Sequence, residues 1–131
     1  MKVPVLVAMA LTASAVIAQP SQPRPRNIEA EDAALYFTDL IALPYAEICD
    51  KRIPGYLARF SPSHTRWRQE NEARIKNGER ALRAATPSMG ETPESARDKA
   101  LDVVRRLETA PQDLVDQQCR SIGRRVGMET P

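Results

Sequence analysis

Apolar and polar positions follow a helical period along most of this chain. From about residue 28 onward, apolar side chains recur three or four positions apart, as they do on one face of an α-helix. No segment alternates apolar and polar residues for long enough to indicate a β-strand. The pattern therefore predicts an all-α protein, a small helical bundle of four to five helices.

Prolines divide the predicted helices. Proline lacks an N–H and is tolerated in the first turn of a helix far better than in its interior. We therefore expect each proline of the folded part to lie at a helix end. The predicted helical segments are 29–43, 45–52, 56–60, 61–85 with Ser61 as N-cap, 92–108 and 111–125.

The helical period also predicts which side chains face the core. In the longest predicted helix the inward stripe is His64, Trp67, Asn71, Ile75, Gly78, Leu82 and Ala85. The next helix buries Ala96, Ala100, Val103, Val104 and Leu107. The apolar seam of the last helix is Val115, Cys119, Ile122 and Val126, and Gly127 is its expected stop.

The first eighteen residues have the pattern of a secretory signal peptide. Lys2 precedes an apolar run that ends in small residues at Ala18, the expected cleavage point. The run is shorter than the about 20 residues that span a bilayer, so we expect no stable membrane anchor after cleavage. The predicted organisation is a signal peptide (1–18), a flexible proline-rich leader (19–27), one helical domain (28–127) and a frayed end (128–131).

Two cysteines, Cys49 and Cys119, are the only ones in the chain. Export to the periplasm or beyond places them in an oxidising compartment, where thiols pair. Each is in register with the apolar positions of its own helix, so a disulfide between them joins the early segment to the last helix. A zinc site is the alternative, but His64 is the only histidine, so carboxylates would have to complete it. We predict one disulfide and no metal or cofactor.

The net charge of the chain indicates no particular class of partner. The chain has 19 Lys and Arg against 17 Asp and Glu, a formal net charge of +2. Such near-neutrality does not favour nucleic acid as a partner. A possible anion patch exists on the last two helices, although the same spacing also fits their solvated faces; its members are Arg105, Arg106, Arg120, Arg124 and Arg125.

Candidate catalytic groups are few. His64 is the only histidine, the residue type most often used for proton transfer, but a lone histidine on an inward stripe also fits a packed core residue. Two carboxylate pairs, Glu47 with Asp50 and Asp113 with Asp116, have the residue types of a glycan hydrolase or of a solvated helix face. None of the glycine-loop, nucleophile-elbow or zinc-helix motifs is present in the sequence.

Trp67 and Asn71 form the sharpest local pattern. Trp67 is the sole tryptophan and is expected to be a core anchor. An amide on a buried stripe needs a partner. For Asn71 we expect that partner in the loop before Pro54 or at a carbonyl freed by Pro44.

The spacing of Cys49, Pro54, Trp67, Asn71 and Cys119 behind a signal peptide resembles that of small exported all-α proteins of proteobacteria whose function is unassigned. The resemblance implies a periplasmic helical protein with a bridged cysteine pair, and it implies no catalytic or binding residues. Some immunity proteins that neutralise the cell-wall enzymes of rival bacteria share this size and helical build, an analogy of architecture alone.

These observations favour a non-enzymatic, periplasmic or secreted protein that binds another macromolecule, such as a protein partner in the cell envelope. A small envelope hydrolase, using a carboxylate pair or His64, is the first alternative. A carrier of an apolar ligand is the second. The sequence leaves the partner and the oligomeric state open.

Overall fold

The computed structural model describes residues 27–129, and all of its secondary structure is helical, as the sequence predicts. The predicted signal peptide and most of the leader lie outside the described residues. Asn27, placed by the sequence at the end of the leader, is the N-cap of the first helix and accepts the N–H of Ala30. The elements are α1 (Ile28–Arg52), α2 (Tyr56–Glu70), α3 (Glu72–Met89), α4 (Pro93–Val104), the 3₁₀ turn η1 (Arg105–Glu108) and α5 (Gln112–Arg125).

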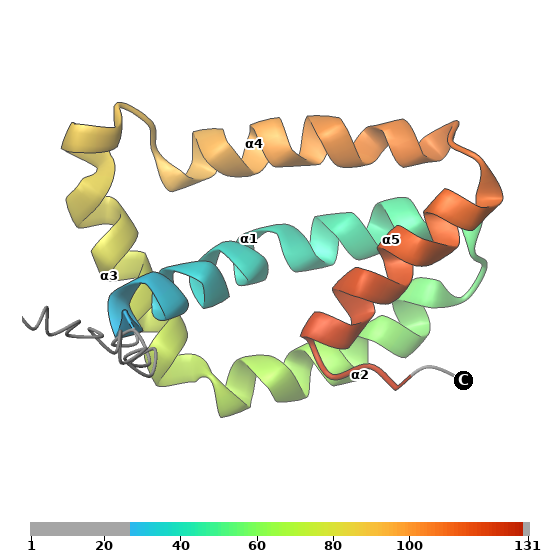
Figure 1. Ribbon diagram of the computed structural model, residues 1–131. Helices are drawn as coiled ribbons and strands as arrows, with labels where there is room; N and C mark the ends of the chain where they lie inside the picture. Colours follow the sequence, from blue (N-terminus) through green and yellow to red (C-terminus); the bar gives the residue numbers. More distant parts are fainter. Residues whose placement is uncertain (1–26, 130–131) are drawn as a thin grey trace, which may run out of the picture.

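Helix α1 is the centre of the arrangement, and every other element packs on it. In Figure 1, α4 runs along one side of α1 and α2 lies on the other side. Helix α3 packs near the N-terminal half of α1, and α5 crosses its C-terminal half. The core lies between these helices, and its most completely buried side chains are Phe60, Val115, Val126, Cys49 and Cys119.

The prediction that prolines mark helix ends is wrong at three positions. Pro44, Pro62 and Pro87 lie inside α1, α2 and α3, so α1 replaces two predicted helices and continues through Pro44. Each proline costs its helix one backbone hydrogen bond. Buried residues on both sides, such as Phe60 and His64 around Pro62, hold the helix in place across that defect.

The predicted helix 61–85 is also wrong, because Asn71 divides it. The Asn71 N–H and its Nδ2 both bond to the carbonyl oxygen of Trp67, the latter at 2.8 Å, and neither Pro54 nor Pro44 is involved. Asn71 is the C-cap of α2 and the N-cap of α3. Asparagine side chains compete with the helical backbone for hydrogen bonds, which explains why the chain bends here.

Helices α1 and α3 are in direct backbone contact at Gly78. A Cβ atom on Gly78 would lie 1.9 Å from the carbonyl oxygen of Asp32. One turn away, Arg74 Nε bonds to the buried carboxylate of Asp32 at 2.7 Å. Gly78 therefore allows α1 and α3 to cross closely, and the Arg74–Asp32 ion pair stabilises this crossing.

Helix α5 ends in a Schellman motif. Gly127 has φ 73°, its N–H bonds to the Arg124 carbonyl, and the Met128 N–H bonds to the Gly123 carbonyl. The expected stop at Gly127 is confirmed. Met128, which the sequence placed in the frayed end, packs against the core instead.

Candidate functional site

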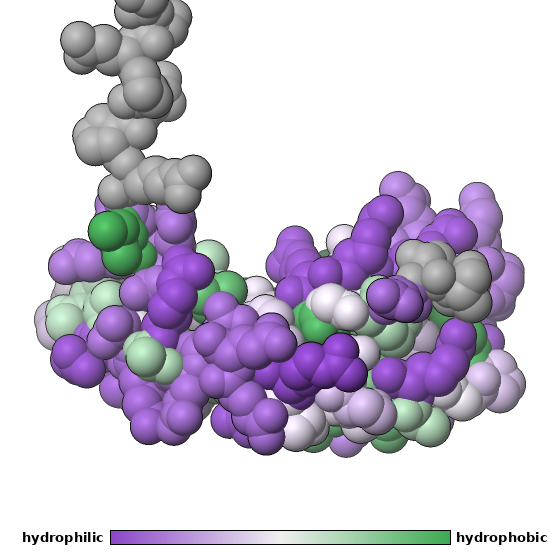
Figure 2. All heavy atoms as spheres, turned by 90° about the horizontal axis from the view of Figure 1, so that it is seen from below, coloured by the Kyte–Doolittle hydropathy of each residue, from purple (hydrophilic) through white to green (hydrophobic). Residues whose placement is uncertain are grey.

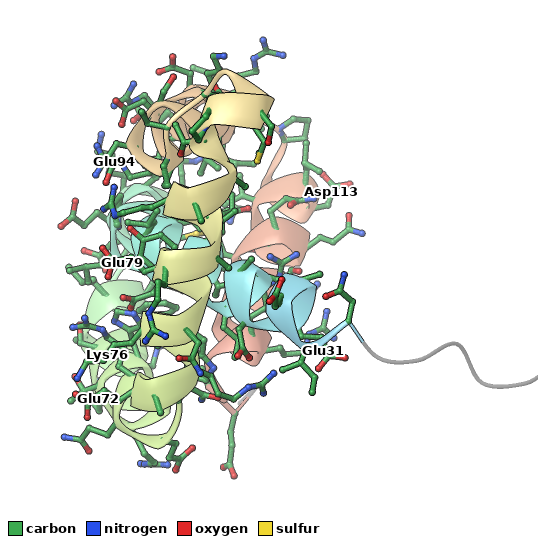
Figure 3. All side chains as sticks on the ribbon, turned by 90° about the vertical axis from the view of Figure 1, so that its left-hand side faces the viewer. Glu31, Glu72, Lys76, Glu79, Glu94 and Asp113 are labelled. Atoms are coloured by element: carbon green, nitrogen blue, oxygen red, sulfur yellow. A yellow bond between two sulfur atoms is a disulfide. The ribbon has the colours of Figure 1, made fainter. Side chains whose placement is uncertain are left out.

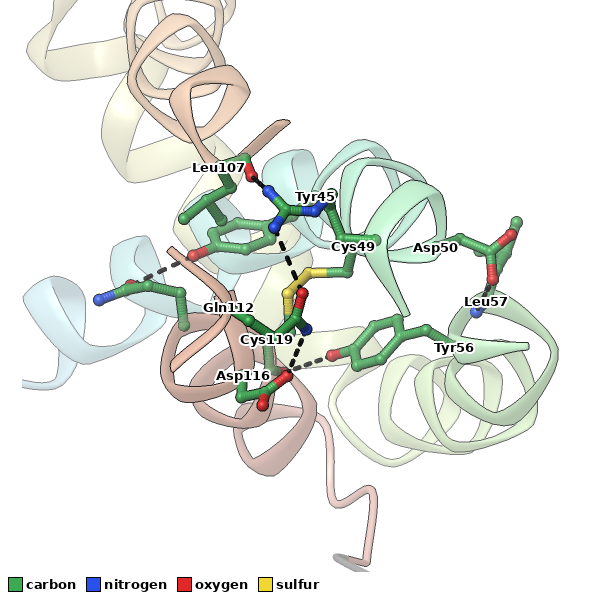
Figure 4. Close-up of a disulfide and its surroundings, with 11 residues drawn as sticks. Tyr45, Cys49, Asp50, Tyr56, Leu57, Leu107, Gln112, Asp116 and Cys119 are labelled. Carbon is green, nitrogen blue, oxygen red and sulfur yellow. Dashed lines mark hydrogen bonds between the residues drawn. A yellow bond between two sulfur atoms is a disulfide. The ribbon is translucent and has the colours of Figure 1, made fainter. Parts of the chain in front are cut away.

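The disulfide between Cys49 and Cys119 is present and joins α1 to α5 across 70 residues, with the two Cα atoms 5.9 Å apart (Figure 4). Both cysteines are completely buried. Beside the bridge, the Tyr56 hydroxyl donates to the carbonyl oxygen of Cys119, so α2 is tied to the same point. The predicted pairing is confirmed, and it fixes α5 against α1.

Arg52 holds the turn that leads into α5. Its Nη1 donates to the carbonyl oxygens of Leu107 and Ala110 at 2.7 and 2.9 Å. Leu107 lies in η1 and Ala110 lies in the turn between η1 and α5, where few backbone N–H groups are available to these carbonyls. Arg52 therefore positions η1 and the N-terminal end of α5 relative to α1.

Between these three elements lies a groove of about 470 Å³, which we call the seam groove. Its floor contains the buried side chains of Ile41, Val104 and Ile122. Across it, the Tyr45 hydroxyl donates to Gln118 Oε1 at 3.3 Å (Figure 4). The full lining is Ile41, Tyr45, Val103, Val104, Arg106, Leu107, Ala110, Leu114, Gln118, Ser121, Ile122 and Arg125.

Exposed apolar side chains gather at this groove. Of the five large hydrophobic residues exposed in residues 27–129, Val103 (60% exposed) and Leu114 (40%) line the seam groove. Met89 lines a second, apolar groove of about 340 Å³ between α1, α3 and the start of α4. The prediction that Val103 is buried is wrong: α4 turns Leu101 into the core and leaves Val103 at the groove.

Within residues 27–129, the seam groove has two charged lining residues, and both are arginines. Arg106 comes from η1 and Arg125 from the last turn of α5. Burial raises the pKa of the Tyr45 hydroxyl above its usual value, and the positive charge of Arg125 partly offsets that increase. The groove thus combines an apolar floor with positive charge.

The rest of the predicted arginine patch does not share this site. Arg105 pairs with Asp102 on α4. Arg120 lines a separate pocket of about 230 Å³ together with Asp116. Arg124 is exposed and lines neither of these sites. The structure therefore brings together only Arg106 and Arg125 of the five predicted residues.

His64 and Trp67 are buried, as the inward stripe predicts, and lie in a column of rings along α2. His64 stacks between Phe60 and Trp67, with ring centroids 5.5 and 6.0 Å away. Its Nε2 is buried without a well-formed hydrogen bond and lies 3.4 Å from Asp39 Oδ1. That same oxygen accepts from Arg68 Nε at 2.8 Å. The His64 ring is thus packed in the core, beside the Asp39 carboxylate, which forms an ion pair with Arg68.

The candidate carboxylate pairs are divided between structural contacts and solvent. Asp50 Oδ1 accepts the Leu57 N–H at 2.9 Å and so caps the start of α2. Asp116 Oδ1 accepts from Gln112 Nε2 at 2.9 Å. The other member of each pair is exposed. Within residues 27–129 no group of three or more metal-ligating side chains converges.

The remaining surface carries mixed charge. Figure 3 shows Glu72, Lys76, Glu79 and Glu94 along one side of α3 and the start of α4, all pointing outward. These residues are paired with one another or with Arg83, which bridges Glu79 and Glu94. From below, the molecule is covered largely by hydrophilic side chains with small, separate hydrophobic areas (Figure 2).

Comparison with known protein families, curated proteins and solved structures found no match for this chain. In the part of the chain that the structure describes, no helix combines the length and apolarity needed to cross a membrane.

Sequence reasoning missed the seam groove, although one signal for it exists. Val103 with Val104, and Leu114 with Val115, are adjacent apolar pairs within helices. Neighbours in a helix point about 100° apart, so both members of a pair are buried only where the helix is covered on a broad face. Each pair here has one buried and one exposed member.

Proposed function

We propose that this protein is exported to the periplasm or beyond and acts, without catalysis, by binding a protein of the cell envelope through the seam groove. The signal-peptide pattern of residues 1–18 and the disulfide support export. One observation carries the binding proposal: the exposed side chains of Val103 and Leu114 flank a groove with a buried apolar floor.

The energetics support a partner at this place. Exposed apolar patches with a polar rim are typical of interaction sites. Complete burial of a Val or Leu side chain stabilises by about 1.5–3 kcal/mol, so covering the exposed parts of Val103 and Leu114 contributes about 1 kcal/mol each. The floor residues gain no comparable amount, because they are already buried.

Capture from an envelope extract of the source organism tests the proposal. The immobilised, oxidised protein is compared with Leu114→Asp and with Leu43→Asp. Leu43 is the matched control, because it is a helical leucine of nearly equal exposure (41% against 40%) that lines neither groove. We expect Leu114→Asp to lose the captured protein and Leu43→Asp to keep it. No retained protein, or equal retention by both variants, contradicts the proposal.

Export has its own test. The intact mass of the protein isolated from the organism should correspond to a chain that begins at Gln19, and reduction should add the mass of two hydrogens. A chain that retains Met1 and does not change mass on reduction would contradict the assignment to an oxidising compartment.

A further inference from the structure

The seam groove has charge of a single sign. Among the residues that the structure describes, Arg106 and Arg125 are the only charged ones that line it. Neither takes part in an ion pair within residues 27–129; the arginines that do are Arg68, Arg74, Arg83, Arg97 and Arg105. The guanidinium donors of Arg106 and Arg125 are therefore available to an anionic group brought by a partner.

The surroundings strengthen such a pairing. Beside the arginines lie the buried side chains of Val104, Leu107 and Ile122. When a partner covers the groove and displaces water, a carboxylate paired with arginine interacts more strongly than it does on an open surface. A partner segment with positive charge meets like charge instead, which opposes binding.

The helical surroundings of the groove favour a helix over an extended strand as the occupant. The described part of the chain consists of helices and offers no sheet edge to which a strand could add. The groove is bounded by α1, by α4 with η1, and by α5. A helix places apolar side chains three and four positions apart on one face, with polar residues at its flanks, and this matches an apolar floor with charged groups at the side.

We propose that the segment entering the seam groove is an acidic amphipathic helix of the partner protein. Its apolar face covers Val103 and Leu114, and its flanking carboxylates pair with Arg106 and Arg125. This inference rests on the proposed function and names the chemistry of the partner at the same site.

Two synthetic peptides of about 18 residues provide the probe, because shorter helices are marginal in water. Both are acetylated and amidated, and both carry the same leucine stripe. One has glutamate at the flanking positions and the other lysine. Fluorescence anisotropy of the labelled peptides, titrated with the oxidised protein at low and high NaCl, gives the affinities.

The wild-type protein should bind the glutamate peptide at least about tenfold more tightly than the lysine peptide, and added NaCl should reduce that difference. The double variant Arg106→Glu/Arg125→Glu should reverse the preference. The control Arg66→Glu/Arg80→Glu makes the same charge change at exposed positions outside both grooves and should leave the preference unchanged. Circular dichroism verifies that each variant is folded.

Equal affinity for the two peptides, binding of neither, or preference for the lysine peptide by the wild-type protein overturns the inference. The capture assay separates this from the proposed function. If capture requires Leu114 but tolerates Arg106→Glu/Arg125→Glu, a partner binds the groove but is not acidic there. If capture is insensitive to both, the proposed function fails as well. Light scattering tests for a dimer of this chain. If the wild-type protein is a dimer and Leu114→Asp is a monomer, the groove binds a second copy, and the inference is overturned.

Discussion

Replacement of Gly78 by alanine should destabilise the protein, although alanine is the better helix former. In an exposed helix interior, Gly→Ala stabilises by about 1 kcal/mol. At Gly78 the added methyl group meets the backbone of α1, with Asp32 O at 1.9 Å, Asp32 C at 2.4 Å and Ala33 N at 2.9 Å. No side-chain rotation relieves a clash with backbone atoms.

The size of the effect follows from this geometry. Ordinary contact begins at 3.4 Å. The two helices must therefore separate by roughly 1.5 Å, which loosens the Arg74–Asp32 pair and the packing of Ile75. Overpacking of this kind costs about 3 kcal/mol, the upper end of the usual range. After the gain in helix propensity, the net loss is about 2 kcal/mol, equivalent to a fall in Tm on the order of 10 °C.

Urea and thermal unfolding with the disulfide intact measure this loss. Gly123→Ala is the control, because the atoms nearest to its Cβ belong to side chains and not to backbone: the flexible Met128 Cε at 2.8 Å can move aside, and the Tyr56 hydroxyl at 3.2 Å has to shift by only a few tenths of an ångström. We expect that control to change the free energy of unfolding by less than about 1 kcal/mol. If Gly78→Ala is as stable as the wild-type protein, the close backbone contact between α1 and α3 does not exist as described.

Three further predictions concern the region around the disulfide. Reduction of Cys49–Cys119, which closes a loop of 70 residues, should lower the free energy of unfolding by about 4 kcal/mol in urea titrations; an unchanged midpoint would contradict it. Burial raises the pKa of Tyr56 from 10.0 to about 12, so this residue contributes stability that is fully present below pH 10 and is lost as the pH rises through about 12. Urea unfolding across this range should therefore show a steeper decline for the wild-type protein than for Tyr56→Phe, and parallel curves would count against the assignment. Arg52→Met removes the donor to the Leu107 and Ala110 carbonyls and should cost about 2 kcal/mol of unfolding free energy; a loss below about 0.5 kcal/mol would show that water replaces it.

The helical class and the cysteine pairing could be predicted from the sequence, because both depend on local and pairwise information. Apolar residues three or four apart specify which face of a helix is buried, whatever that face meets. Phe60, His64 and Trp67 follow this rule, and so does the inward register of Cys49 and Cys119. With only two cysteines in the chain, a single pairing is possible.

Helix boundaries could not be predicted at Pro44, Pro62 and Asn71, because local preference competes there with tertiary packing. A proline inside a helix costs a few kcal/mol in isolation. The buried residues that flank Pro44 and Pro62 offset this cost only once the other helices are in place. At Asn71 the balance goes the other way, and one side-chain hydrogen bond to Trp67 ends a helix that the periodicity would continue.

The sequence alone therefore determined that the chain is helical, which face of most helices is buried and which two cysteines join. Only the tertiary structure decided that Gly78 touches the backbone of α1, that Arg52 holds η1, and that Arg106 and Arg125 share one groove. The physical reason is that each of these contacts joins elements far apart in the chain. Their meeting depends on how the helices cross, and the helical period carries no information about crossing angles or distances.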